Sequence, residues 1–289
     1  MDSKDIVKFG LIGYPIKHSL SPKMHNAAFR KFNLPYRYCL YPLKTDDFNN
    51  FNGFLDKENI KGLNVTVPYK EEILAYLDSK SDSVAAIGAA NTIVKKDEKI
   101  RGFNTDFLGF SKHLNEIADP CRLRVALLGA GGAAKAVVYS LIKDKAGIIS
   151  LFDIDVEKGK DLVRKSKKWI EDCKSDAAVN QVESVEELDI LNKDLLINAT
   201  PVGLKESDPL LVEKKFLHKN LIVYDLIYNP ARTKLLAAAE EKGLRFSNGL
   251  GMLIYQGAES FLHFSEANLE ISKVAAVMEE ALTNRGAEC

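Results

Sequence analysis

The sequence is poor in cysteine and in paired histidines, which argues against two classes of site. Its four cysteines, at positions 39, 121, 173 and 289, lie far apart, and none forms a CxxC pair. This spacing fits reduced thiols in a cytosol better than a disulfide framework or a zinc site. The five histidines do not pair at metal-ligand spacing either. We therefore expect no metal site and no disulfide.

The chain also lacks net charge and long apolar runs. Lysine plus arginine equals aspartate plus glutamate, 40 against 40, which gives no reason to expect nucleic acid or an anionic membrane as partner. No apolar run could span a bilayer, and the acids near the start do not fit a signal peptide. We expect a soluble cytoplasmic protein with a small-molecule partner. The sequence leaves monomer and homodimer open.

Strand-like and helix-like segments alternate along the chain. Expected strands cover residues 8–13, 36–43, 62–68, 124–129, 148–153, 195–200 and 221–226, and expected helices cover 23–33, 46–55, 69–77, 107–117, 133–143 and 157–170. Residues 89–106 indicate two strands around the charged turn KKDEK. Alternation of this kind predicts an α/β fold with mostly parallel sheets, and the length predicts two domains. From Gly251 we expect two helices that return to the first domain.

A glycine-rich turn follows the expected strand at 124–129. The segment VALLGAGGAAKA places Gly129, Gly131 and Ala134 in a GxGxxA pattern that opens a helix. Gly129 permits a tight turn, Gly131 lets a pyrophosphate approach the backbone, and Ala134 lets the helix pack on the strand. A turn without a ligand is the alternative, but the strand, the helix and an acid at the next strand end favour a dinucleotide.

That acid is Asp153. A carboxylate at this position accepts hydrogen bonds from the adenosine ribose and repels a 2′-phosphate. At a separation of about 4 Å and an effective dielectric of about 20, each like charge costs about 4 kcal/mol. We therefore expect NAD to be preferred, with NADP as the alternative. Lys158 and Lys160 could instead reach a phosphate, and Asp155 could be the cap of the next helix.

Polar residues gather at the ends of strand-like segments in the first domain. Asn64 and Thr66 share one face of the strand before Lys70, and the segments GAANT and GFNTD bring Asn91, Asn104, Thr105 and Asp106. Ser19 and Ser21 are again two residues apart. Each has a plain structural alternative: a turn cap, a strand residue or a solvated lysine. Together the set fits a polyhydroxylated ligand, because each hydroxyl needs a donor and an acceptor.

At this point the motifs match a known family. In order they are HSLSPKMHN, NVTVPYK, GAANT, GFNTD, GAGGAA, NATPVG, YDLIYNP and GLGMLIYQGA. With them the chain resembles the shikimate/quinate dehydrogenase family over nearly its whole length. The resemblance implies a substrate domain of residues 1–110 completed by residues 250–289, and a Rossmann domain of residues 111–249. It also implies reversible hydride transfer between 3-dehydroshikimate and shikimate, in the pathway to chorismate and the aromatic amino acids.

The resemblance assigns roles to individual residues. It implies Lys70 and Asp106 as the catalytic pair, with Lys70 carrying the proton of the reacting oxygen. The implied substrate ligands are Ser19, Ser21, Asn64, Thr66, Asn91, Tyr228 and Gln256. The implied cofactor contacts are Gly129, Ala130, Gly131, Gly132, Ala133, Asp153, Thr200, Leu226, Gly249 and Met252.

The chain departs from the family pattern after the second Rossmann strand. The family commonly has Asn-Arg-Thr there, whereas this chain has DID at 153–155 and so lacks the arginine that would bind a 2′-phosphate. This departure again favours NAD and leaves quinate open as a secondary substrate. Two further alternatives are a non-catalytic sensor of nucleotide and metabolite, and a Rossmann methyltransferase. A sensor would not need Lys70 and Asp106, and both are present.

Overall fold

The computed structural model describes residues 6–283, apart from the side chains at positions 46 and 47. It divides into two compact units: unit 1 runs up to Gly109 and resumes at Ile254, and unit 2 runs from Phe110 to Leu253. The described cysteines are all free thiols, and Cys289 lies outside the described residues. Within residues 6–283, the structure contains no helix with the length and apolar character needed to cross a bilayer.

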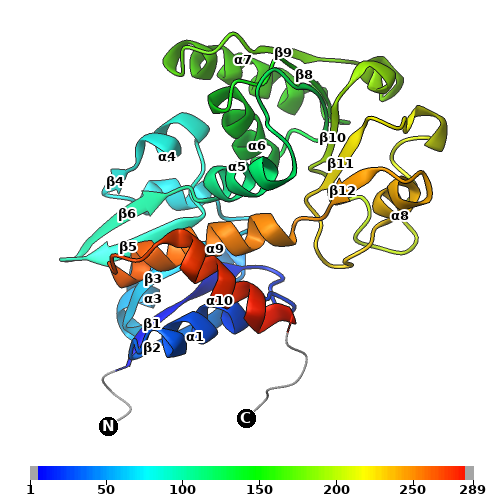
Figure 1. Cartoon of the computed structure of the whole chain (residues 1–289). Helices are drawn as coiled ribbons and strands as arrows, with labels where there is room; N and C mark the ends of the chain where they lie inside the picture. The colour runs from blue at the N-terminus through cyan, green and yellow to red at the C-terminus, as the bar shows by residue number, and fades with distance from the viewer. Residues whose placement is uncertain (1–5, 284–289) are drawn as a thin grey trace. The chain divides into compact units, whose positions relative to one another are not determined.

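The six-stranded sheet of unit 1 has the order β2-β1-β3-β5-β6-β4 (Figure 1). Its strands are β1 (Val7–Gly13), β2 (Tyr36–Pro42), β3 (Ile60–Val65), β4 (Ser79–Lys80), β5 (Thr92–Lys96) and β6 (Lys99–Phe103). The pairs β1/β2, β1/β3 and β4/β6 are parallel. The β5/β6 hairpin is antiparallel, with Asp97 and Glu98 at positive φ in its turn. The expected hairpin around KKDEK is therefore confirmed.

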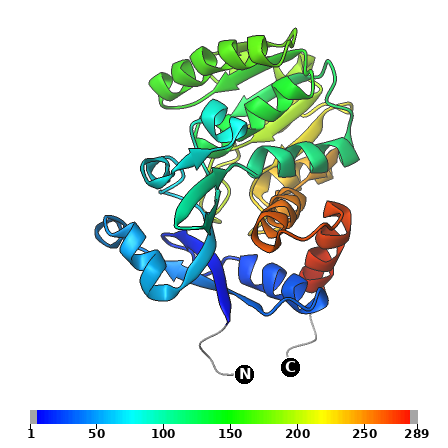
Figure 2. The ribbon, with the colours of Figure 1, turned by 90° about the vertical axis from the view of Figure 1, so that its left-hand side faces the viewer.

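Helices cover both faces of this sheet. One face holds α1 (Ser21–Lys31) and the unit 1 part of α9 (Leu250–Ser265), where Phe9 of β1 stacks on Phe264 at 4.7 Å between ring centroids. There α10 (Ile271–Thr283) lies beside α1, as Figure 2 shows. The other face buries the apolar side chains of α2 (Thr45–Phe48), α3 (Phe51–Glu58), the 3₁₀ helix η1 (Glu72–Tyr76) and α4 (Asp82–Ile87). The expected return of the C-terminal helices is confirmed.

Two expected helices of unit 1 differ from the structure. The helix expected at 46–55 is two short helices, because Asn50 between them has non-helical backbone angles of −110° and 44°. The helix expected at 69–77 is only η1, since Tyr69 is inserted into the core before it begins. The strand expected at 62–68 ends at Val65, and the chain then turns toward Pro68. Only the strand error lies at a segment end, where local pattern is weakest.

The six-stranded sheet of unit 2 has the order β12-β11-β10-β7-β8-β9, and every neighbouring pair is parallel. The strands are β7 (Arg124–Leu128), β8 (Ile148–Phe152), β9 (Ala178–Gln181), β10 (Leu195–Asn198), β11 (Ile222–Asp225) and β12 (Arg245–Ser247). This is the doubly wound order, whose direction of winding reverses between β7 and β10. Ligands of such sheets bind beside that point, at the carboxyl ends of the strands.

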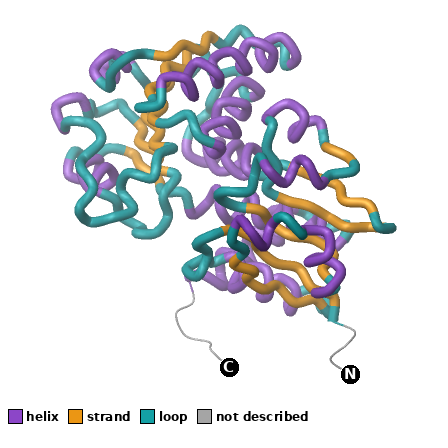
Figure 3. The backbone as a smooth tube through the Cα atoms, turned by 180° about the vertical axis from the view of Figure 1, so that it is seen from behind, coloured by secondary structure: helices purple, strands orange, loops and turns teal. Residues whose placement is uncertain are grey.

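Helices flank the unit 2 sheet, whose strands are orange in Figure 3. They are α5 (Asp106–Ile117), which begins in unit 1, α6 (Gly132–Lys143), α7 (Val156–Asp172) and α8 (Lys234–Glu241). On one face of the sheet, apolar side chains of α8 pack against those of β7, β10 and β11 and form a continuous core. On the opposite face, Phe110 of α5 meets Tyr224 of β11 at 5.2 Å between ring centroids. The predicted α/β fold with two mostly parallel sheets is confirmed.

Candidate active site

Lys70 follows β3 on a segment fixed by its neighbours. Tyr69 is buried, stacks on Phe48 at 4.2 Å between centroids, and donates its hydroxyl to the carbonyl of Leu43 at 2.9 Å. The amide of Ala90, in the GAANT segment, donates to the carbonyl of Lys70 at 2.8 Å. Because Tyr69 points into the core, the next side chain, Lys70, is directed away from it.

The Lys70 side chain meets Asp106, the first residue of α5. Its Nζ lies 2.6 Å from Oδ2 of Asp106, and the side chains are 19% and 9% exposed. An ammonium and a carboxylate at this distance form a charge-assisted hydrogen bond. Two groups that are distant in sequence therefore meet in unit 1. The lysine is the more solvent-accessible of the two.

Asn91 binds the other oxygen of Asp106. Its Nδ2 donates to Oδ1 of Asp106 at 2.8 Å, and its Oδ1 accepts the backbone N–H of Thr105 at 2.7 Å. The Thr105 contact fixes which end of the amide faces Asp106. Gln256 of α9 adds its Oε1 at 3.3 Å from the same Nδ2. Lys70, Asn91, Asp106 and Gln256 thus form one hydrogen-bonded group.

The serine pair lies at the start of α1. The hydroxyl of Ser19 donates to that of Ser21 at 3.2 Å, and the amide of Ser21 donates back to Ser19 Oγ at 3.3 Å. Thr66, just after β3, lies against Gly13 at the end of β1. A Cβ at Gly13 would collide with the Thr66 methyl group, so the glycine makes room for this side chain.

Asn64 behaves differently from the other expected substrate ligands. Its side-chain amide is 5% exposed and is engaged at both ends: Oδ1 accepts from the Tyr38 hydroxyl at 2.7 Å, and Nδ2 donates to Ser260 Oγ at 2.8 Å and Thr92 Oγ1 at 3.0 Å. These partners are core residues. The geometry therefore favours a role for Asn64 inside the protein over direct contact with a ligand.

In unit 2, the glycine turn fits a dinucleotide. Gly129 has φ +102°, and a Cβ there would lie 3.0 Å from the carbonyl oxygen of Ala199. Gly131 is the N-cap of α6, and a Cβ at Gly131 or Gly132 would meet no atom within 4 Å. Open space above a helix N-terminus is what a pyrophosphate requires. Ala133 follows in the first turn of that helix.

Asp153 is held at the end of β8 by two backbone amides. Its oxygens accept from Ala130 N at 2.6 Å and from Asp155 N at 2.7 Å. The carboxylate is thereby fixed beside the glycine turn, with lone pairs left for ribose hydroxyls. Asp155 is the N-cap of α7, accepting from Lys158 N at 3.2 Å, and the Lys158 side chain pairs with it. Ile154 between them is 92% exposed.

The loops after β10 and β11 are tied together by polar groups that the sequence reasoning missed. The buried Asp225 accepts from Asn198 Nδ2 at 3.0 Å and from the hydroxyl of Thr233 at 2.7 Å, and burial raises the pKa of its carboxyl. Asn198 in turn accepts the hydroxyl of Thr200 at 2.7 Å. The sequence signal for these groups was a polar residue at the end of a buried strand, as in the segments NAT and YD.

The remaining expected residues of unit 2 lie near these loops. A Cβ at Gly249 would collide with the carbonyl of Leu226, so only glycine permits this close approach. Met252 is buried in the first turn of α9. Tyr228 lies on the loop after β11, and burial raises the pKa of its phenol.

Comparison with known proteins identifies the family. A model of the shikimate dehydrogenase substrate binding domain matches residues 11–93. A shikimate dehydrogenase (NADP(+)) of Dehalococcoides mccartyi is 40% identical over 256 residues, which are 88% of this chain and 88% of that protein. The chain belongs to the shikimate dehydrogenase family.

Solved structures of the family have the same fold. The crystal structure of shikimate dehydrogenase from Aquifex aeolicus matches with a TM-score of 0.87 at 35% identity, covering 98% of this chain and 100% of that one. The structure of shikimate 5-dehydrogenase from Listeria monocytogenes, in complex with shikimate and NAD, matches with a TM-score of 0.81 at 33% identity, covering 96% and 97%. The resemblance drawn from the motifs is thus confirmed.

Family membership makes the protein a nicotinamide-dependent oxidoreductase. Within residues 6–283, no group of three or more metal-ligating side chains is close enough to hold an ion.

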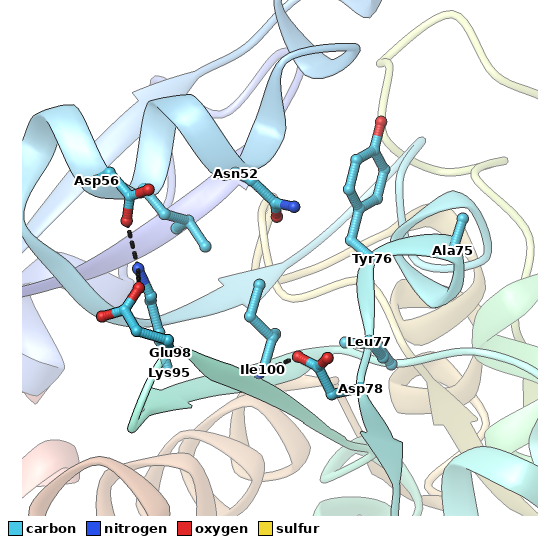
Figure 4. Close-up of a pocket in the computed structure, with 10 residues that line it drawn as sticks. Asn52, Asp56, Ala75, Tyr76, Leu77, Asp78, Lys95, Glu98 and Ile100 are labelled. Atoms are coloured by element: carbon cyan, nitrogen blue, oxygen red, sulfur yellow. Dashed lines mark hydrogen bonds and ion pairs between the residues drawn. The ribbon is translucent and has the colours of Figure 1, made fainter.

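Unit 1 also has a cavity of about 370 Å³ away from the expected residues (Figure 4). Among its charged groups, Lys95 forms ion pairs with Asp56 and Glu98. Asp78 accepts a hydrogen bond from the backbone N–H of Ile100.

Proposed function

We propose that the protein catalyses the reversible oxidation of shikimate to 3-dehydroshikimate, in the biosynthesis of chorismate and the aromatic amino acids. The observation that carries this proposal is the ion pair between Lys70 and Asp106, 2.6 Å apart. Asn91 and Gln256 lie next to the pair. Their amide groups offer the donors and acceptors that a substrate with several hydroxyls requires. The structure of the Listeria relative, which contains shikimate and NAD, supports the same substrate.

Lys70 is proposed to move the proton. Gly129, Gly131 and Asp153 would hold the nicotinamide cofactor, which would supply the acceptor for the hydride of the carbinol carbon. The neutral amine of Lys70 accepts the hydroxyl proton as the carbonyl forms, and in the reverse direction its ammonium returns that proton to the alkoxide.

Asp106 is proposed to hold both the lysine and the substrate. Its Oδ2 faces Lys70 and its Oδ1 faces Asn91, so the carboxylate cannot rotate freely. Each oxygen keeps a further lone pair that can accept a substrate hydroxyl. The two bonds hold the Lys70 amine beside the position of that hydroxyl. Because the amine is already in place, less entropy is lost on reaching the transition state.

The remaining polar residues are proposed to orient the ring. Ser19 and Ser21 donate to the substrate carboxylate, since their hydroxyl oxygens lie together, 3.2 Å apart. Thr66, Asn91, Gln256 and Tyr228 are proposed as ligands of the ring hydroxyls. We propose residues 1–110 with 250–289 as the substrate domain and 111–249 as the Rossmann domain.

NAD is proposed as the preferred cofactor. Asp153 is fixed beside the glycine turn by Ala130 and Asp155, and it would repel a 2′-phosphate. Lys158 and Lys160, which could offset that repulsion, pair with Asp155 and Glu157. The NAD in the Listeria structure is consistent with this preference. The name of the Dehalococcoides relative specifies NADP(+), so NADP is the alternative that the experiment has to include.

A spectroscopic assay tests the function. The protein is incubated with shikimate or quinate and with NAD or NADP, and the absorbance of the reduced nicotinamide is followed. We expect the highest kcat/KM for shikimate with NAD. Quinate oxidised with a higher kcat/KM would assign the protein to quinate metabolism. No reduction with either substrate would support a sensor and overturn the proposal.

A further inference from the structure

The amide of Asn64 lies between two side chains that come from opposite ends of the chain. Tyr38 of β2 donates to its Oδ1, and Ser260 of α9 accepts from its Nδ2, although Ser260 is 196 residues away in sequence. All three side chains are at least nine-tenths buried. An amide with a donor on one side and acceptors on the other has only one favourable orientation.

Tyr38 is itself held in place. Its backbone N–H and C=O both bond to the side chain of Asn26, each at 2.9 Å, and its ring stacks on His25 at 4.2 Å with an interplanar angle of 5°. The position of its hydroxyl, and with it the hydrogen bond to Asn64, is thereby fixed.

Ser260 connects the amide to the other end of the site. Its hydroxyl donates to the carbonyl of Gln256 at 2.8 Å, and the hydroxyls of Thr92 and Thr105 lie within 2.9 and 3.1 Å. The amide of Thr105 binds Asn91, which holds Asp106. A continuous set of buried hydrogen bonds thus runs from Tyr38 to Asp106.

We propose that Tyr38 and Ser260 are positioning residues that act through Asn64 on the reacting end of the bound substrate. Tyr38 fixes the side-chain oxygen of Asn64, whose Nδ2 donates to the carbonyl of Asn91 at 3.2 Å. Ser260 fixes Asn91 and Gln256 at the end where Lys70 and Asp106 react. Asn64 is then a positioning residue itself, and not a substrate ligand. This inference rests on the proposed function, because it assigns these residues to the binding of shikimate.

Two conservative variants with matched controls test it. Tyr38→Phe keeps the ring stack and removes only the hydroxyl, and Ser260→Ala removes only the bonds of one serine. Tyr76→Phe, which loses a hydroxyl bond to the carbonyl of Phe48, and Ser166→Ala, which loses a bond to the carbonyl of Val163, are the controls. We expect kcat/KM for shikimate to fall about tenfold in each test variant, the effect of about 1.4 kcal/mol, and KM for NAD to stay unchanged. The controls should match the unchanged protein.

A double-mutant cycle then distinguishes positioning from general destabilisation. If Tyr38 acts through Asn64, Tyr38→Phe should reduce kcat/KM far less in the Asn64→Ala background than in the unchanged protein. The Kd of shikimate, measured by calorimetry, should show the same non-additivity without turnover. Additive effects, or test variants that behave as the controls do, would overturn the inference and leave the function intact. Failure of the unchanged protein to oxidise shikimate would overturn the function, and the inference with it.

Discussion

Asp106 contacts a cation on one oxygen and an amide on the other, so its charge and its shape can be tested separately. Asp106→Asn keeps the size of the side chain but removes the charge that holds Lys70 at 2.6 Å. We expect kcat for shikimate oxidation to fall about a hundredfold, within the range typical of a misplaced general acid or base. Steady-state kinetics would measure this change. Asp144→Asn, which loses a carboxylate bond to Ser111 in unit 2, is the matched control and should retain full activity.

The cofactor preference also depends on single residues. Replacing Asp153 with serine and Ile154 with arginine removes the repulsive charge and restores a phosphate-binding cation. We expect the ratio of kcat/KM for NADP to that for NAD to rise at least a hundredfold, by about 3 kcal/mol or more. Asp155→Asn retains the helix cap but removes a nearby charge, and it should leave the ratio nearly constant. A kcat/KM for NADP that equals or exceeds that for NAD in the unchanged protein would contradict the NAD preference.

At the scale of elements, substitutions at two glycines of the same turn should affect different properties, cofactor binding in one case and the stability of unit 2 in the other. Gly131 has a φ of −73° with open space around it, so Gly131→Ala should fold normally. Its methyl group would occupy the pyrophosphate path, and KM for NAD should rise. Gly129 has φ +102°, so Gly129→Ala should lower the stability of unit 2 by about 1–2 kcal/mol. Fluorescence of the single tryptophan, Trp169, which is buried in α7, would follow this unfolding. Equal stability of the two variants would contradict the expectation.

Long elements with strong periodicity could be predicted from the sequence, and short ones could not. The strands β1, β7 and β8 and the helices α1, α6 and α7 were expected close to their observed bounds. The missed elements β4, α4, α8 and β12 are short. The three residues of β12, Arg245–Ser247, carry almost no pattern and form a strand only because they pair with β11.

The candidate site was predictable to the extent that it lies at strand ends. Lys70 and Asp106 follow β3 and β6, and Asn91 precedes β5, which pairs antiparallel with both strands, so their convergence follows from the sheet. Tyr38 and Ser260 could not be found in this way. A tyrosine on an edge strand and a serine on a C-terminal helix become partners of Asn64 only through tertiary packing, which no local pattern encodes.

At the scale of the whole molecule, His25 makes stability depend on pH. Its ring is fully buried, and neither ring nitrogen has a hydrogen-bond partner among the residues that the structure describes. Burial lowers its pKa from 6.5 to about 3. Between these values the unfolded chain binds a proton that the folded chain does not, so the stabilisation present above pH 6.5 is lost as pH falls toward 3.

A histidine substitution tests this dependence. Each pH unit below 6.5 lowers the free energy of unfolding by about 1.4 kcal/mol through this group. His25→Phe keeps an aromatic ring beside Tyr38 and removes the titration, so between pH 7 and pH 5 it should lose about 2 kcal/mol less than the unchanged protein. Urea unfolding followed by circular dichroism would measure both. His18→Asn, at an exposed position, should change the pH dependence little, and an unchanged slope in His25→Phe would contradict the burial argument.

The central claim is that the amine of Lys70 carries the proton of the reacting hydroxyl. The most direct test is shikimate oxidation by Lys70→Ala, measured in the absence and presence of a small primary amine such as ethylamine. We expect kcat to fall by about three orders of magnitude with a modest change in KM for shikimate, and to recover in proportion to the amine concentration. Near-normal turnover by the variant without added amine would contradict the claim.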